Sequence, residues 1–94
     1  MRPRVLVVDD DPVTRRLAES ALRSRCEVVT APDGAVALVM ARRFRPDLII
    51  SDLMMPVLDG VGLKARLAAD AHLAATPFIF LTSRTDEETR AQGL

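Results

Sequence analysis

Acidic and hydroxyl side chains follow three separate apolar runs of the chain. Asp9 and Asp10 come directly after Val5–Val8, Asp52 follows Leu48–Ile50 and one serine, and Thr82 follows Phe78–Leu81. Carboxylates that meet in a small volume repel one another, and a hard cation with oxygen ligands, such as Mg²⁺, relieves that repulsion. A carboxylate whose charge is offset in this way can attack phosphorus and form an aspartyl phosphate, while a threonine hydroxyl donates to a phosphoryl oxygen. The residue types therefore predict phosphoryl-transfer chemistry at a divalent metal site.

The apolar runs alternate with segments of helical periodicity. Runs typical of strands covered on both faces occur at Val5–Val8, Cys26–Thr30, Leu48–Ile50 and Phe78–Leu81. Helices are expected to begin after Asp11, Asp33 and the Pro56–Gly60 loop, and again at Thr85 with Glu88 as its capping-box partner. This alternation predicts an α/β fold with right-handed βαβ units and a mainly parallel sheet.

The strand order decides whether the acidic residues can act together. Ligands of open parallel sheets bind in the crevice outside the carboxyl ends of the strands. If the first and third strands are neighbours, about 4.8 Å apart, Asp9, Asp10 and Asp52 meet in one pocket at that edge. The expected partner of this pocket is a divalent cation.

Other polar side chains have simpler structural explanations. Asp11 is interpreted as the N-cap of a helix with Pro12 at its first position, and Arg15 is expected to face away from the apolar side of that helix. The side chains of Met54 and Met55 are interpreted as loop packing, since thioethers suit soft metals. Solvated helix ends explain a further set of side chains: Arg42, Arg43, Arg45 and His72.

Composition limits the class of protein. Ninety-four residues, 49% of them hydrophobic, predict one domain spanning residues 1–94. The 13 basic residues balance the 13 acidic ones, so no overall field favours nucleic acid or an anionic membrane. Cys26 is the single cysteine, which excludes a disulfide framework and predicts a small buried side chain. With no apolar run of signal-peptide or membrane-spanning length, a cytoplasmic location is expected.

Three segments resemble the response-regulator receiver family of two-component signalling. They are VLVVDDDP at residues 5–12, PDLIISDLMMPVLDG at 46–60 and FLTS at 80–83. The resemblance extends over essentially the whole chain, and its central segment is highly specific. It implies a flavodoxin-like, doubly wound parallel sheet with strand order 2-1-3-4.

The resemblance also implies a role for each site residue. Asp52 matches the phosphoacceptor, Asp10 a direct metal ligand and Asp9 a metal-site acid that acts mainly through water. Met54 matches the position that lends a backbone carbonyl to Mg²⁺, and Thr82 the hydroxyl that follows the phosphoryl group. The implied phosphodonor is a histidine of a sensor kinase or phosphotransfer protein. Self-phosphorylation and slow hydrolysis of the acyl phosphate are the only reactions expected, so the chain is a signalling protein rather than an enzyme.

The chain departs from the family pattern after its fourth strand. Five βα units of about 25 residues need roughly 120 residues, so a fifth strand and helix are expected to be missing. The family's lysine, which follows the fifth strand, is missing with them. Lys64 cannot replace that lysine, because it falls in the third expected helix. The Phe78–Leu81 strand would then be an exposed edge through which copies could associate, and an output domain could follow residue 94.

Two alternative functions fit part of the sequence. Asp9–Val13 also resembles the D-x-D-x-V start of haloacid-dehalogenase-like phosphatases, which would make Asp9 the nucleophile. That family gives no reason for the segment around Asp52. The second alternative is a receiver-like interaction module that signals without phosphorylation, which the acidic trio argues against and the missing lysine favours.

Overall fold

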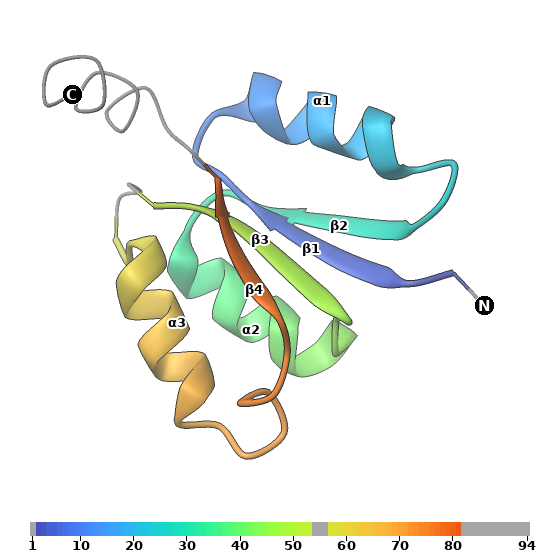
Figure 1. The fold of residues 1–94 in the computed structure, drawn as a ribbon. Helices are drawn as coiled ribbons and strands as arrows, with labels where there is room; N and C mark the ends of the chain where they lie inside the picture. The colour runs from blue at the N-terminus through green and yellow to red at the C-terminus, as the bar shows by residue number, and fades with distance from the viewer. Residues whose placement is uncertain (1, 54–56, 82–94) are drawn as a thin grey trace, which may run out of the picture.

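A computed structural model describes residues 2–53 and 57–81 of the chain. Its elements, in chain order, are β1 (Arg4–Val8), α1 (Pro12–Leu22), β2 (Glu27–Ala31), α2 (Gly34–Phe44), β3 (Leu48–Asp52), α3 (Gly60–Ala68) and β4 (Phe78–Leu81). The strands form one parallel sheet in the order β2-β1-β3-β4 (Figure 1). The predicted α/β class and strand order are confirmed.

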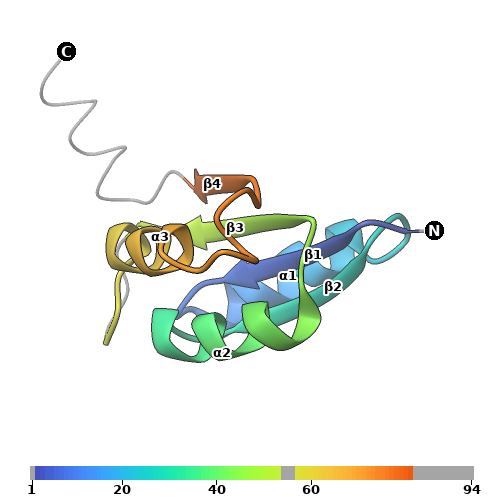
Figure 2. The same cartoon turned by 90° about the horizontal axis from the view of Figure 1, so that it is seen from below.

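The helices lie on both faces of the sheet. Figure 1 shows α1 on one side of the sheet and α2 with α3 on the other, and Figure 2 gives the same arrangement from below. The face under α2 and α3 forms a continuous core in which Leu6, Val8 and Ile49 are fully buried. Ala37 and Ala41 of α2 are also fully buried, and their small side chains let the helix approach the sheet closely.

The face under α1 is only half covered by the described residues. Val7, Ile50 and Ile79 are in register across β1, β3 and β4 on this face. Val7 is fully buried beneath α1, whereas Ile79 is 51% exposed. In α1 itself, Val13 and Leu17 are 61% and 65% exposed, so the described residues cover less than half of these two apolar side chains.

Two expectations from the sequence need correction or fall outside the structure. Cys26 is half-buried rather than buried, because it lies in the turn before β2, where its N–H donates to the Leu22 carbonyl at 2.8 Å. The helix expected from Thr85 and Glu88 lies outside the described residues. Within residues 2–53 and 57–81, no helix has the length and apolar character needed to cross a membrane.

Gly34, at the start of α2, lies against the loop between β3 and α3. A Cβ built at Gly34 would overlap the backbone carbonyl oxygen of Leu58 and come within 2.8 Å of its Cβ. The preceding residue, Asp33, caps α2 by accepting from the Val36 N–H at 2.8 Å. Gly34 is therefore the residue that allows the β3–α3 loop to pack on the first turn of α2.

We expect Gly34→Ala to lower the free energy of unfolding by about 1–3 kcal/mol, because the backbone of Leu58 must move to admit the methyl group. Gly62→Ala is the matched control, since its new Cβ would meet the movable end of the Leu58 side chain at 2.7 Å. Alanine also favours the helix at Gly62 by about 0.5–1 kcal/mol, so this variant should lose less. Urea unfolding of both variants measures the difference, and equal losses would contradict the proposed contact.

Candidate metal and phosphoryl site

Parallel pairing of β1 with β3 brings the predicted acidic residues together. The register pairs Val8 with Ser51, so the residues that follow them, Asp9 and Asp52, reach the same edge of the sheet. One carboxylate oxygen from each of Asp9, Asp10 and Asp52 lies within 4.8 Å of the other two. The convergence expected from the strand order is thus present.

Asp9 is the most enclosed member of the trio. It is only 5% exposed, its N–H donates to the Ala31 carbonyl at 3.1 Å, and its Oδ1 accepts from the Asp11 N–H at 2.9 Å. Burial raises the pKa of the Asp9 carboxyl, and the charges of Asp52 and Asp10 raise it further, while the Asp11 N–H opposes them. Without a cation, the ionised form of Asp9 is therefore disfavoured.

Asp10 and Asp52 differ from Asp9 in their access to solvent. Asp10 is exposed, whereas Asp52 is half-buried at the end of β3. The buried Ser51 beside it donates through Oγ to the Asp52 carbonyl at 2.9 Å. The trio thus has one enclosed acid, one intermediate acid and one open to incoming molecules.

The ends of the β3–α3 loop are fastened close to β3. The Gly60 N–H donates to the Leu53 carbonyl at 3.1 Å, and a Cβ at Gly60 would come within 2.6 Å of the Asp52 carbonyl oxygen. Asp59 caps α3 by accepting from the Gly62 N–H at 2.8 Å. These contacts fix the backbone on either side of Met54, which lies outside the described residues, as does Thr82.

The outer acid, Asp11, is the N-cap of α1. Its carboxylate accepts from the Val13 N–H at 2.9 Å and from Thr14 Oγ1 at 3.1 Å, as the sequence predicted. The Val13 N–H is the main reason why the pKa of the Asp11 carboxyl is lowered. Asp11 therefore serves the helix and is not a member of the trio.

Arg15 is the site residue that the sequence reading missed. The sequence predicts only that Arg15 lies away from the apolar side of α1, and the structure shows in addition that its Nη1 donates to the backbone carbonyl of Asp9 at 2.6 Å. Side chains in a helix point back toward its N-terminus, so a long arginine one turn after the cap can reach the end of the preceding strand. The position of Arg15 one turn after the N-cap Asp11 is therefore the sequence signal for this contact. Hydrophobic periodicity carries no such signal.

The donor set fits a hard cation. Oxygen ligands about 2.1 Å from one Mg²⁺ lie at most about 4.2 Å from one another, so carboxylate oxygens within 4.8 Å need only small side-chain adjustments. Three carboxylates supply oxygen alone, which suits Mg²⁺ better than a soft metal. The residues therefore fit a magnesium site.

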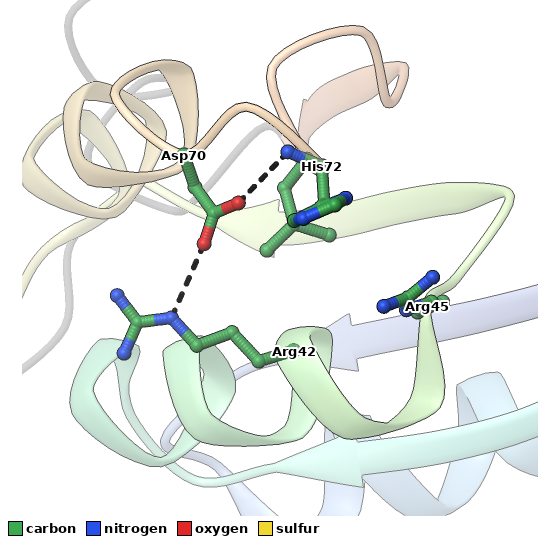
Figure 3. Close-up of a pocket in the computed structure, with 5 residues that line it drawn as sticks. Arg42, Arg45, Asp70 and His72 are labelled. Atoms are coloured by element: carbon green, nitrogen blue, oxygen red, sulfur yellow. Dashed lines mark hydrogen bonds and ion pairs between the residues drawn. The ribbon is translucent and has the colours of Figure 1, made fainter.

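A second polar cluster lies at the opposite edge of the sheet, where α2 ends. Figure 3 shows this pocket, which is lined by Arg42, Arg45, Asp70, His72 and Leu73. Asp70 accepts from the His72 backbone N–H at 2.9 Å and pairs with Arg42 Nε at 3.3 Å. These two contacts lower the pKa of the Asp70 carboxyl and tie α2 to the segment after α3. Arg42, Arg43 and Arg45 are exposed at the end of α2, as predicted for a solvated helix end, and Arg42 also forms an ion pair with Asp70.

Comparisons of the sequence with family models and with known proteins agree on one family. The sequence model described as the response regulator receiver domain matches residues 5–94. The chain is 39% identical over 93 residues to the sensor histidine kinase TmoS of Ectopseudomonas mendocina, covering 99% of this chain and 10% of that protein. It is 46% identical over 93 residues to the transcriptional regulatory protein PrrA of Mycobacterium bovis, covering 98% of this chain and 39% of that protein. The chain therefore spans well under two thirds of these relatives.

A solved structure supports the same grouping. The receiver domain of the sensor histidine kinase PA1611 from Pseudomonas aeruginosa PAO1 superposes with a TM-score of 0.85 at 33% identity. The match covers 97% of this chain and 75% of that one. In that structure a magnesium ion is coordinated in the active site cleft.

Asp9→Asn should raise the melting temperature of the metal-free protein by a few degrees at neutral pH. A raised pKa means that the ionised carboxylate weakens the fold, and this cost is absent below the ordinary carboxyl value of about 3.9 and grows as the pH rises through the folded-state value. Asparagine keeps an oxygen that can accept from the Asp11 N–H and removes the charge.

Thermal unfolding followed by circular dichroism, from about pH 4 to neutral pH, measures the gain, which should disappear at the acid end. Asp11→Asn is the control, because the pKa of that carboxyl is lowered and removal of its charge brings no such gain. A neutral-pH melting temperature of Asp9→Asn at or below that of the wild type would contradict the assigned repulsion.

Proposed function

This chain belongs to the response regulator receiver family of two-component signalling, and we propose that Asp52 accepts a phosphoryl group, with Mg²⁺ held by Asp9, Asp10 and Asp52. The observation that carries the proposal is the meeting of these carboxylates within 4.8 Å at the carboxyl edge of β1 and β3. The donor is proposed to be a phosphohistidine of a sensor kinase or phosphotransfer protein.

The environments of the acidic residues support different roles. The backbone of Asp52 pairs with Leu81 in the β3–β4 ladder. This pairing fixes the position of the main chain from which the Asp52 carboxylate would attack phosphorus. In the transfer, a carboxylate oxygen forms the new O–P bond as the N–P bond of the donor breaks and the donor imidazole keeps the electron pair. Asp10 is the exposed member of the trio, and we propose that the donor approaches from its side. When bound, Mg²⁺ offsets the negative charge of the carboxylates and the phosphoryl oxygens.

Met54 and Thr82 complete the proposed site on the basis of the family pattern. The Met54 backbone carbonyl is proposed as a metal ligand, and the Thr82 hydroxyl as the donor to a phosphoryl oxygen. Reaction at this site is limited to self-phosphorylation and hydrolysis of the acyl phosphate, in keeping with a signalling module in the cytoplasm.

The haloacid-dehalogenase-like alternative has less support than the receiver assignment. It requires Asp9 as nucleophile, yet Asp9 is 5% exposed and its Oδ1 already accepts from the Asp11 N–H. The interaction-module alternative differs from the proposal only in whether Asp52 becomes phosphorylated, so one experiment separates all three.

The described residues leave part of the sheet face beneath α1 uncovered. We propose that the fifth strand and helix expected from the family pattern pair with β4 and cover Val13, Leu17 and Ile79, which are at least half exposed. Association of copies along β4, which carries the exposed Ile79, is the alternative proposal. An output domain after residue 94 is proposed by analogy with the longer relatives, of which the chain spans 10% and 39%.

The test is incubation of the full natural protein with acetyl phosphate and Mg²⁺, followed by mass spectrometry of its peptides. We expect one phosphoryl adduct on Asp52, which is lost in Asp52→Asn and strongly reduced when a chelator removes the metal. Asp47→Asn is the matched control, because Asp47 precedes the same strand at its opposite end and should leave labelling unchanged. An adduct on Asp9 would support the phosphatase alternative, and no adduct would support the interaction module.

A further inference from the structure

Arg15 links α1 to the turn that carries two of the acidic residues. Its Nη1 lies 2.6 Å from the Asp9 carbonyl oxygen, just below the usual range of about 2.7–3.2 Å for an N–H···O hydrogen bond. A hydrogen bond from a charged donor is roughly twice as strong as one between neutral groups. This contact is the direct link between the helix interior and the Asp9–Asp10 peptide.

The bonded carbonyl belongs to the peptide that joins Asp9 to Asp10. Before Asp9, the chain is fixed by the bond from the Asp9 N–H to the Ala31 carbonyl. After Asp10, the next peptide is held by the bond from the Asp11 N–H to the Asp9 carboxylate. Asp10 is exposed, and its carboxylate has no hydrogen-bond partner within the described part of the chain. The direction of the Asp10 side chain therefore depends on the planes of the two peptides that flank it, and Arg15 bonds the carbonyl of the preceding one.

We propose that Arg15 is a positioning residue of the acidic site, which acts by fixing the Asp9–Asp10 peptide so that the Asp10 carboxylate faces Asp9 and Asp52. This inference rests on the proposed Mg²⁺ site and adds a determinant of its affinity. Loss of Arg15 leaves all three carboxylates in the chain but releases Asp10 from its position.

Geometry and charge predict opposite effects of removing Arg15. A positive charge beside the site repels Mg²⁺, so its removal by itself would tighten metal binding. Loss of the hydrogen bond would weaken binding, as is usual when a residue that orients a metal ligand is changed. Lysine keeps the charge, but its Nζ lies one bond nearer the backbone than arginine Nη1 and falls short of the Asp9 carbonyl, so Arg15→Lys separates the two effects.

The experiment is a Mg²⁺ titration of the full natural protein, followed by the amide resonances of Asp10 and Asp11 in ¹H–¹⁵N NMR spectra. The variants are Arg15→Lys, Arg15→Met and Arg16→Met. Arg16 is the matched control, because it is exposed on the same helix and has no hydrogen bond from its side chain to another described residue. Thermal unfolding of each metal-free variant verifies that it is folded.

We expect the dissociation constant for Mg²⁺ to rise about tenfold in both Arg15 variants and to stay within about twofold of the wild-type value in Arg16→Met, since exposed charges are screened. An unchanged constant in Arg15→Lys, or tighter binding in Arg15→Met, would overturn the positioning role.

A wild-type protein that fails to bind Mg²⁺ would overturn the proposed function rather than this inference. In that case the spectra of the metal-free proteins test the positioning role of Arg15, because the Asp10 amide belongs to the peptide that Arg15 bonds. A shift of that resonance in both Arg15 variants but not in Arg16→Met supports the role, and an unshifted resonance overturns it.

Discussion

The central constraint on this structure is the repulsion among the carboxylates of Asp9, Asp10 and Asp52, which the pairing of β1 with β3 keeps close together. Two unit charges 4.8 Å apart repel by about 3 kcal/mol at an effective dielectric constant of about 20. This repulsion is opposed by the ladder between β1 and β3 and by a core in which Leu6, Val8 and Ile49 are fully buried. The carboxylates therefore repel one another while the paired strands keep their backbone in place. A cation can relieve this repulsion without a large change in the fold.

Most of the architecture could be predicted from the sequence. Alternating strand and helix patterns fixed the class, and the carboxyl-edge rule for parallel sheets identified Asp9, Asp10 and Asp52 as neighbours once the strand order was given. The order 2-1-3-4 came from family resemblance, because periodicity within a segment carries no information about which strands pair. Asp11 was correctly separated from the trio, since a capping residue is recognised from its immediate neighbours alone.

Features that depend on contacts distant in the chain could not be predicted. Periodicity in α1 identifies an apolar stripe, but the exposure of Val13 and Leu17 depends on which element lies beside the helix. Cys26 was placed at the start of a strand, whereas the chain is still turning there. The Arg15 contact was missed because a reading of helix faces ignores the direction along the axis in which a long side chain extends.

The contact between Gly34 and Leu58 has a mechanical consequence. Because not even a methyl group fits between them, the loop that follows Asp52 and the beginning of α2 cannot move closer together; they can only slide or separate. A rearrangement of that loop would thus push directly on a neighbouring helix, by a route that bypasses the strands. If the phosphorylation proposed for Asp52 displaces that loop, α2 is the element that meets the displacement by steric contact.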